Sequence, residues 1–413
     1  MSGSCVRPPP PAPSRKGRGN IAVPVFLFFS LCAGVVAAES ANGEVTLVTP
    51  EGDEQRHTLK GLSETELQLE LGAVPLKDVA VIVFAPRPAP STEGTAMHLR
   101  NGDVLCNAAP IAGDEAKLTF KGGALGEVKL DYKFLAAVTF AGKELPAADA
   151  LEAFLKAPPP KEDQLLTAKG ETVSGYLEKF TGKDLSFNSG GQSRAYPYEQ
   201  LAAFRFAPLE EYKPRAELRG AIELRDGSRV TGKLLELTEG KLKFEALNGQ
   251  IWALAVETLS NIAFKGGKLV YLSELAPSLA EEKPYVGGMP VVYRWQRDRS
   301  ALGTRMIIAA KPYERGLGVH SFARLEYDLA GQYAKFLSDV GLDDAAAGGL
   351  CDWKVLLDGK EAAAGTAKPG RKAEALRLDL KGVQQLALIC DYGPDDSDAG
   401  DCLDWAGARL LKP

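Results

Sequence analysis

The sequence predicts an all-β protein in which four small β-barrel-like repeats precede a C-terminal β-sandwich. Glycine and proline are plentiful, with 43 and 26 residues in a chain of 413, and they favour many turns and short strands. One apolar pattern recurs four times after the N-terminal region. From about Tyr271 onward the pattern changes to longer alternating segments, which are typical of a sandwich.

The N-terminal segment 1–38 has the pattern of a secretory signal peptide. Four basic residues precede an uncharged run from Ile21 to Ala38, and Val36 and Ala38 are placed for cleavage after small residues. The alternative is a retained N-terminal anchor, because eighteen uncharged residues nearly span a bilayer. We therefore expect a secreted, periplasmic or cell-envelope protein that contacts a membrane only if this leader is uncleaved.

Charge and motifs exclude several classes of function. Loss of the leader takes the formal net charge from −5 to about −9. Phosphate backbones are bound by lysine and arginine, and the sequence has no concentrated basic stripe, so we expect no nucleic-acid partner. The motifs G-x-S-x-G, H-E-x-x-H and G-x-x-x-x-G-K-[ST] do not occur. We therefore expect a protein that is not an enzyme.

Each repeat begins with an apolar pair, passes a glycine turn, and closes on an apolar run that ends in phenylalanine. The closing residues Phe84, Phe140, Phe206 and Phe264 are 56, 66 and 58 residues apart. Glycine turns such as Asn101-Gly102 favour hairpins, because glycine accepts the positive φ of a primed turn. We interpret each copy as a small bent barrel, similar in architecture to SH3-like or Sm-like barrels, at 39–86, 95–142, 164–208 and 217–266.

The connecting segments are rich in proline or polar residues. The stretches 87–94 and 208–217 are interpreted as linkers. Between the second and third repeats, 143–163 is predicted to hold one short helix and a proline-rich linker. Pro146 suits the first helical turn, and three consecutive prolines at 158–160 end the helix.

The C-terminal region 268–413 contains about eight candidate strands separated by turns, and this pattern predicts a β-sandwich. The segment ARLEYDL alternates well, with Leu325, Tyr327 and Leu329 on one side. The apolar stretch VVYRW (291–295) is counted among the strands. Asp358-Gly359 is a further hairpin turn.

Several stretches of this region are similar to the NPCBM family, which is named for proposed carbohydrate-binding modules at the ends of glycosidases. They are YLSELAP (271–277), RDRSALG (297–303), YERGLGVHS (313–321), LEYDL (325–329), SDVGLDD (338–344), VLLDGK (355–360) and DWAGARL (404–410). The resemblance covers the C-terminal third and says nothing about 39–265. It implies a galactose-binding-like jelly-roll β-sandwich.

The stretch GLGVHS (316–321) contains one of the three histidines of the chain. Gly316 and Gly318 predict a close backbone approach or an unusual φ where the chain enters a core strand. We interpret His320 as a half-buried histidine bonded to neighbouring polar groups; the alternative is a histidine that contacts a ligand.

Sugar binding requires an aromatic face together with polar groups for the hydroxyls. The candidate carbohydrate-binding residues are His320, Trp353, Tyr392 and Trp405. For the two tryptophans the alternative is a place in the sandwich core, where large aromatic side chains bury much area. Tyr392 lies beside an acidic loop and is the better candidate for exposure.

The acidic loop CDYGPDDSDAGDCLDW holds six carboxylates that would repel one another unless they are solvated or neutralised by a cation. A calcium site is therefore one interpretation, and a solvated loop is the other; the family resemblance implies a structural calcium. The candidate ligands are Asp391, Asp395, Asp396, Asp398, Asp401 and Asp404. Cys390 and Cys402 flank the loop and are a candidate disulfide pair, with Cys351 as a competing partner.

The sequence thus supports two hypotheses of function. In the first, an exported, non-catalytic protein binds a galactose-type glycan through its C-terminal module. In the second, the protein is a scaffold whose sandwich and barrels bind other proteins of the cell envelope, because repeated small units often build extended binding surfaces.

Overall fold

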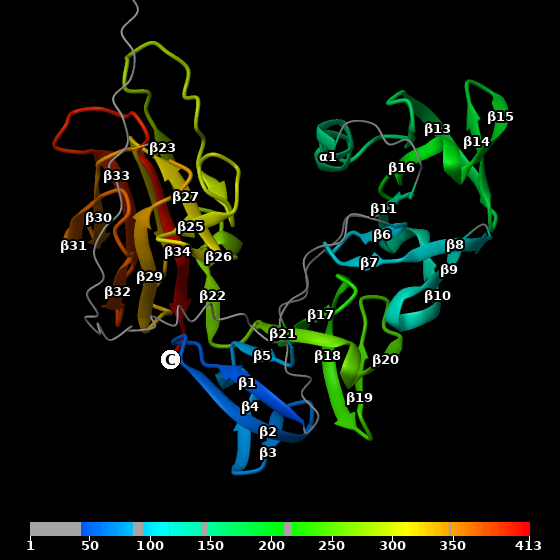
Figure 1. Cartoon of the computed structure of the whole chain (residues 1–413), viewed down its shortest axis with the longest axis horizontal. Coiled ribbons are helices and arrows are strands. Elements are labelled where there is room, and N and C mark those ends of the chain that lie inside the picture. Colours follow the sequence, from blue (N-terminus) through cyan, green and yellow to red (C-terminus); the bar gives the residue numbers. More distant parts are fainter. Residues whose placement is uncertain (1–42, 86–93, 115, 142–147, 210–216, 347) are drawn as a thin grey trace, which may run out of the picture. The chain divides into compact units, whose positions relative to one another are not determined.

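A computed structural model describes residues 43–85, 94–114, 116–141, 148–209, 217–346 and 348–413 (Figure 1). The predicted fold class is confirmed, because strands dominate these residues. The predicted leader at 1–38 and most of the two linkers lie outside them. Among the described residues, no helix is long and apolar enough to cross a membrane.

One order of elements recurs four times, with a short 3-10 turn before each closing strand. Repeat 1 comprises β1 (Glu44–Val48), β2 (Glu54–Leu62), β3 (Glu66–Leu69), β4 (Gly72–Pro75) and β5 (Val81–Val83). Repeat 2 comprises β6 (Ala96–Leu99), β7 (Val104–Cys106), β8 (Ala108–Gly113), β9 (Lys117–Gly122), β10 (Gly126–Asp131) and β11 (Leu135–Thr139). Repeat 3 comprises β12 (Asp163–Thr167), β13 (Thr172–Phe180), β14 (Asp184–Ser189), β15 (Gln192–Pro197) and β16 (Leu201–Arg205). Repeat 4 comprises β17 (Arg219–Leu224), β18 (Arg229–Thr238), β19 (Lys241–Glu245), β20 (Ile251–Ala255) and β21 (Leu259–Lys265).

The predicted short helix is α1 (Ala148–Lys156), which lies between repeats 2 and 3. Repeat 2 has one more strand than the others because its second strand is divided at Asn107, whose φ is +55°. Asparagine accepts this left-handed conformation more readily than most residues.

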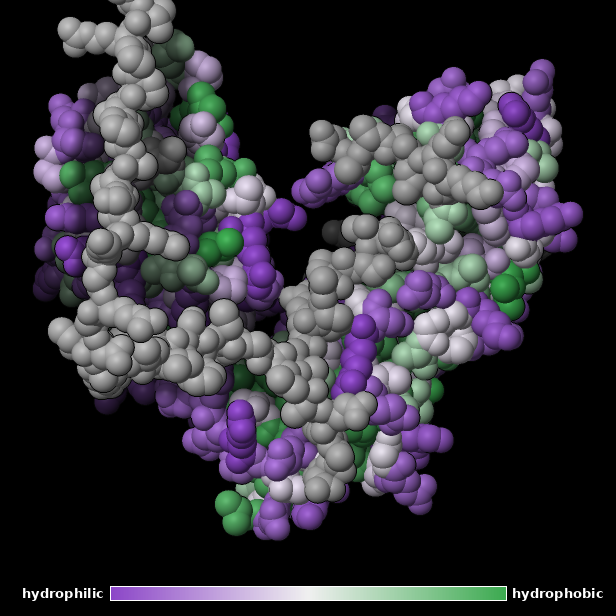
Figure 2. Space-filling model, viewed as in Figure 1, coloured by the Kyte–Doolittle hydropathy of each residue, from purple (hydrophilic) through white to green (hydrophobic). Residues whose placement is uncertain are grey.

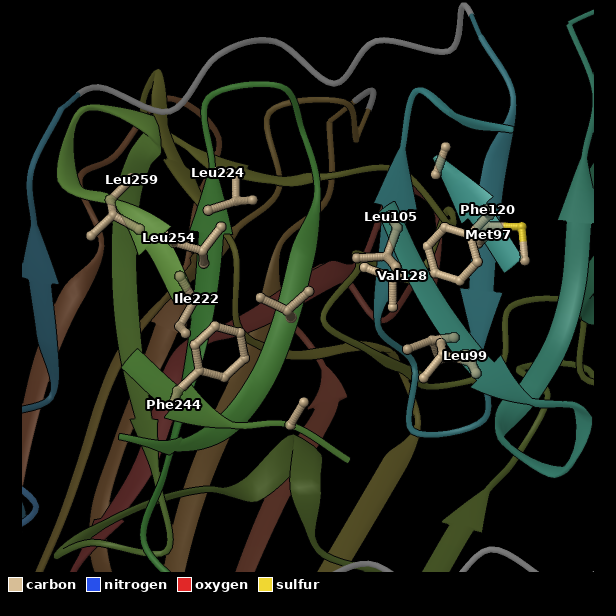
Figure 3. Close-up of a cluster of buried hydrophobic side chains, with 14 of the residues drawn as sticks. Met97, Leu99, Leu105, Phe120, Val128, Ile222, Leu224, Phe244, Leu254 and Leu259 are labelled. Atoms are coloured by element: carbon tan, nitrogen blue, oxygen red, sulfur yellow. The ribbon is translucent and has the colours of Figure 1, made fainter. Parts of the chain in front are cut away.

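Alternation along the strands places every second side chain in a shared core. In β19, Leu242 and Phe244 are fully buried, whereas Lys241 and Lys243, which alternate with them, face solvent. The four closing phenylalanines are also buried. Figure 3 shows side chains of this core, with Met97, Leu99, Leu105, Phe120 and Val128 from repeat 2 and Ile222, Leu224, Phe244, Leu254 and Leu259 from repeat 4.

In each repeat the closing strand pairs with the first strand, and strands of different repeats also pair. The closing strands β5 and β21 pair with each other, as do β11 and β16. A short pairing joins β7 to β18. The result is one continuous hydrogen-bonded array of 18 strands that runs through all four repeats.

The C-terminal region forms two large antiparallel sheets and a separate two-stranded sheet of β25 and β26 (Figure 1). The first has the order β24-β27-β34-β29-β32, with β22 on β34, and the second has the order β23-β28-β33-β30-β31. The strands are β22 (Leu269–Tyr271), β23 (Leu279–Glu282), β24 (Gln296–Arg297), β25 (Met306–Ile308), β26 (Lys311–Tyr313), β27 (Gly316–His320), β28 (Ala323–Asp328), β29 (Lys335–Leu342), β30 (Cys351–Leu357), β31 (Lys360–Ala367), β32 (Glu374–Asp379), β33 (Gln385–Tyr392) and β34 (Cys402–Leu411).

The space between the two sheets is filled by large side chains. Trp353 from β30 and Trp405 from β34 meet edge to face, with ring centroids 6.0 Å apart. Tyr327 and Phe336 are also fully buried in this core. By contrast, hydrophilic residues predominate on the face of the molecule shown in Figure 2, where hydrophobic residues form small separate patches.

The prediction for GLGVHS is confirmed: the stretch enters a core strand, β27, and both glycines are required by geometry. Gly316 has a φ of +145°, which few other residues adopt. A Cβ on Gly318 would lie 2.5 Å from the Cα of Ser300. His320 ends the strand half-buried.

We expect the substitution Gly318→Ala to destabilise the sandwich by about 2 kcal/mol, because overpacking against rigid backbone has this order of cost. Urea unfolding followed by tryptophan fluorescence measures the effect, since three of the four tryptophans lie in the sandwich. Gly287→Ala is the control, because nothing lies within 4 Å of its added Cβ. Equal stability of the two variants would contradict this account.

Candidate functional site

The loop between β23 and β24 displays a run of exposed apolar side chains. Pro284 and Pro290 lack the N–H that a strand ladder needs, and Gly287-Gly288 lies between them. The large hydrophobic residues Tyr285, Val286, Met289, Val292 and Tyr293 are all exposed, with 42% to 76% of their surface accessible. Such a cluster at one place is unusual for a surface that has no binding role.

The prediction of a strand at VVYRW (291–295) is wrong, because this stretch belongs to the loop. Its end is fixed by Glu282, whose carboxylate accepts the N–H of Trp295 at 2.6 Å and pairs with Arg294 at 3.1 Å. The apolar residues are therefore presented from an anchored segment.

Two aromatic contacts hold the loop on the ends of the sandwich strands. The rings of Tyr293 and His320 are 4.9 Å apart and tilted by 31°. The rings of Tyr285 and Tyr392 are 5.1 Å apart and nearly perpendicular. The Tyr285 hydroxyl also donates to the carbonyl of Asp396 at 2.5 Å. The loop, β27, β33 and the acidic turn therefore meet at one end of the sandwich.

Hydrogen bonds among His320, Ser321, Leu350 and Asp401 connect the segments at this end of the sandwich. Nδ1 of His320 lies 3.0 Å from the carbonyl oxygen of Ser321, so this nitrogen carries a proton and Nε2 is left for another partner. The Ser321 hydroxyl donates to Asp401 at 2.7 Å, and the N–H of Leu350 donates to the same carboxylate at 2.9 Å. Burial raises the pKa of Asp401, while the Ser321 and Leu350 hydrogen bonds and the nearby His320 lower it.

The four predicted sugar-binding residues separate into two groups. His320 and Tyr392 lie at the end of the sandwich described above. Trp353 and Trp405 are 2% and 0% exposed, so neither indole has a face that a sugar could contact. The expectation that these two tryptophans bind carbohydrate is therefore corrected: they form the core instead, because they project inward from facing sheets.

The predicted calcium ligands are not brought together. Among the described residues, no group of three or more His, Cys, Asp or Glu side chains is arranged to hold a metal ion. Asp401 belongs to the network above, Asp391 accepts the N–H of Tyr392, and Asp404 is fully buried. Asp395 and Asp396 are exposed and Asp398 is half-buried. The solvated loop, the alternative interpretation, is thus closer to this geometry than the calcium site.

The predicted disulfide between Cys390 and Cys402 is also corrected, because both residues are free thiols in this structure. Cys390 lies on β33 and Cys402 on β34, in different sheets. Burial, and next the neighbouring Cys351 thiol, raise the pKa of Cys390. Cys351, the competing partner, is thus the thiol that contacts Cys390.

Asp404 is a carboxyl group buried beside another carboxyl group. Asp343 accepts the N–H of Ile307 at 3.0 Å and that of Ala345 at 2.9 Å. No hydrogen-bond donor among the described residues reaches either oxygen of Asp404. Burial, and next the charge of Asp343, raise the pKa of Asp404 well above its ordinary range.

The sequence analysis did not predict that Tyr285 contributes to the site, or that the loop between β23 and β24 exposes an apolar surface. A signal was present: in PYVGGMP the prolines and glycines exclude a strand, and apolar residues between them have no sheet face on which to be buried. Tyr293 belongs to the stretch VVYRW, which the sequence analysis counts among the strands.

The sandwich corresponds to a known family. Residues 268–411 match the family described as NPCBM/NEW2 domain. Similar solved structures include CBM51 from Clostridium perfringens GH95 in complex with methyl-galactose, with 25% identity, a TM-score of 0.31, and coverage of 35% of this chain and 99% of that one. A search of curated proteins finds no match.

Two further structures are similar to the chain. CBM51-2 in complex with GlcNAc and INT domains from Clostridium perfringens ZmpB is 20% identical, with a TM-score of 0.31 and coverage of 43% of this chain and 39% of that one. The tandem CBM51 modules of Sp3GH98, the family 98 glycoside hydrolase from Streptococcus pneumoniae SP3-BS71, are 16% identical, with a TM-score of 0.30 and coverage of 63% and 91%.

The substitution Asp404→Asn tests the protonation of this carboxyl group. An acid whose folded-state pKa is raised contributes stability below its unfolded pKa and loses it as pH rises through the folded pKa. The asparagine does not titrate and its amide donates to Asp343. We therefore expect the free energy of unfolding at about pH 8 to rise, by about 1.4 kcal/mol for each unit of raised pKa, with less change at about pH 5.

Thermal unfolding at both pH values, with EDTA and with calcium, measures this effect. Asp396→Asn is the matched control, because Asp396 is exposed and its φ of +49° suits asparagine equally well. A loss of stability at the higher pH that appears only with calcium would show that the ionised Asp404 serves as a cation ligand.

Proposed function

We propose that the protein is an exported, non-catalytic binding protein whose C-terminal module binds carbohydrate of the galactose type at the cell envelope or outside the cell. The match of residues 268–411 to the NPCBM/NEW2 domain family supports this proposal. The observation that carries it is the exposed ring of Tyr293, 42% accessible and 4.9 Å from the ring of His320.

The chemistry of this surface suits a sugar. Tyr293 and the neighbouring Val292 offer an apolar face for the C–H groups of a pyranose ring. Nε2 of His320 accepts or donates a hydrogen bond to a hydroxyl, depending on its protonation. Arg294 is exposed and follows Tyr293 directly, which adds donors at the rim. An apolar platform with a few polar groups beside it is the usual composition of a small-molecule site.

The scaffold is the second candidate, and one observation favours it: the array of 18 strands joins all four repeats into one surface. In this alternative the sandwich and the repeats bind other proteins of the envelope rather than a glycan. Both candidates are non-catalytic, and they differ in whether the isolated chain binds a free sugar.

Isothermal titration of the full chain with methyl galactoside, followed by N-acetylglucosamine and a glycan array, tests the proposal. We expect Tyr293→Ala to weaken sugar binding at least about tenfold, equivalent to about 1.4 kcal/mol, because the ring face is removed. Tyr176→Ala is the matched control, since Tyr176 is 61% exposed in repeat 3.

The native chain's failure to bind any sugar on the array would overturn the proposal and favour the scaffold. If both tyrosine variants lost binding equally, Tyr293 would have no specific role and the site would lie elsewhere. Circular dichroism of the variants separates a loss of contact from a loss of fold.

A further inference from the structure

The repeats associate in pairs through a contact that occurs twice. In repeats 1 and 4 the closing strands pair about Ile82 and Ile262, which lie opposite each other. In repeats 2 and 3 they pair about Val138 and Phe204. All four residues occupy the same position, two before the closing phenylalanine. Each pair is thus related by a local two-fold axis through equivalent residues.

The hydrogen bonds around each axis are also equivalent. Each closing phenylalanine donates its N–H to a carbonyl of the partner repeat, at the position four residues before that repeat's own phenylalanine. The bonds are Phe84 to Ser260 at 2.8 Å, Phe264 to Ala80 at 2.9 Å, Phe140 to Ala202 at 2.9 Å and Phe206 to Ala136 at 3.0 Å.

A second type of contact joins repeats 2 and 4 through the strands that follow their first glycine turns. Val104 lies opposite Arg229, and both are two residues after the turn glycine. The carboxylate of Asp103 accepts the N–H and the hydroxyl of Thr231, each at 2.7 Å.

A second hydrogen bond, between the equivalent positions with the two repeats exchanged, makes this contact symmetric. The Ser228 hydroxyl accepts the N–H of Cys106 at 2.9 Å. Asp103 and Ser228 hold the same position in their repeats, as do Cys106 and Thr231. Both Asp103 and Ser228 are 3% exposed, so this second contact, the turn-edge contact, is closely packed.

The two contacts alternate and place the repeats in the order 1, 4, 2, 3. Repeat 3 therefore ends the array with its turn edge exposed: Glu171, Thr172 and Ser174 face solvent. Ser174 lies opposite Gln164 just as Cys106 lies opposite Ala96, so its N–H points outward in the same way. At the other end, the turn of repeat 1 is already in contact with Arg409, which donates to the carbonyls of Pro50 and Glu51 at 3.0 and 2.7 Å.

We propose that repeat 3 binds repeat 3 of a second copy of this chain through this turn edge, forming a two-fold dimer. Repeat 3 carries both halves of the Asp103–Thr231 interaction: an acid, Glu171, and a hydroxyl residue, Ser174, at the equivalent positions. A two-fold axis brings Glu171 of each copy to the N–H and hydroxyl of Ser174 in the other copy. An edge that is self-complementary in this way gives a closed dimer.

The surface around the turn edge of repeat 3 is also compatible with a second copy of this repeat. A hollow of about 730 Å³ borders the edge and is lined by Thr167, Lys169, Glu171, Val173, Arg194 and Tyr196, among others. Its charges are of both signs, so an identical surface is an electrostatically acceptable partner. An unpaired strand edge is also a ready template for pairing with another chain. Because the edge is short, we expect a dissociation constant of roughly micromolar order.

The residue that lies on the two-fold axis of the proposed dimer allows a direct test by cross-linking. Residues directly opposite each other in antiparallel strands have Cα atoms about 4.5–5.5 Å apart, within the range of a disulfide. Thr172 is equivalent to Val104 and Arg229, which lie opposite each other, so Thr172 of one copy faces Thr172 of the other. We expect the full-length Thr172→Cys variant to form a covalent dimer under mild oxidation.

Tyr176→Cys is the control, because this exposed residue lies on the same strand beyond the paired segment; it should cross-link at least tenfold more slowly. Sedimentation velocity of the full chain over a concentration series should show a monomer–dimer equilibrium. Glu171→Lys should weaken it at least tenfold, whereas Glu66→Lys, the same charge change at an exposed site in repeat 1, should not.

Three outcomes would overturn the proposal. In the first, the native chain remains monomeric at roughly 100 μM, far above the expected dissociation constant. In the second, a dimer forms that is insensitive to Glu171→Lys. In the third, oligomers grow beyond the dimer and are abolished by Arg56→Ala, where Arg56 holds in repeat 1 the position of Ser174. The last result would mean that repeat 3 of one copy meets repeat 1 of the next. None of these outcomes depends on sugar binding.

Discussion

Four backbone hydrogen bonds, one from the N–H of each closing phenylalanine, join the four repeats into two pairs. A five-stranded unit of fewer than about sixty residues buries little apolar surface by itself and is marginal in stability. Pairing the closing strands satisfies backbone groups that would otherwise form an open edge. It also brings neighbouring cores into contact, so that one hydrophobic cluster extends through repeats 1 to 4. The repeats are therefore stabilised as pairs.

The sandwich meets its packing requirement in a different way. The nearly perpendicular indoles of Trp353 and Trp405 fill the space between its two sheets. Glycine is found where two backbone segments approach closely, as at Gly318. The rigid strands then carry irregular segments at one end, where the loop anchored by Glu282 exposes its tyrosines and valines. A rigid scaffold that positions variable loops is the common arrangement for binding sites.

The sequence predicted what depends on local pattern. Alternation and glycine turns identify strands and hairpins, because side-chain direction and φ are set locally.

The prediction of a strand at 291–295 is wrong because a run of valine and tyrosine resembles a strand unless the preceding proline and glycines are given more weight. Trp353 lies between Asp352 and Lys354, and Trp405 follows Asp404; such a pattern does not distinguish a core face from a binding face. Asp404 precedes Trp405 on β34 and is buried on the opposite face of that strand, and its neighbour Asp343 is known only from the folded structure. The pairing of repeats could not be predicted either, because every closing strand offers the same edge and only the fold selects the partner.

The choice of partner has a consequence for how the chain is made. Val138 and Phe204, which join repeats 2 and 3, are 66 residues apart, whereas Ile82 and Ile262, which join repeats 1 and 4, are 180 residues apart. During synthesis from the N-terminus, repeats 2 and 3 can associate soon after both have left the ribosome. Repeat 1 emerges first but must wait for repeat 4, so the edge of β5 that does not pair with β1 stays open while the intervening chain is translated. Contacts so distant in sequence form slowly, and an edge left open during elongation is exposed to wrong partners. Among the four repeats, the order of translation therefore leaves the closing strand of repeat 1 waiting longest for its partner repeat.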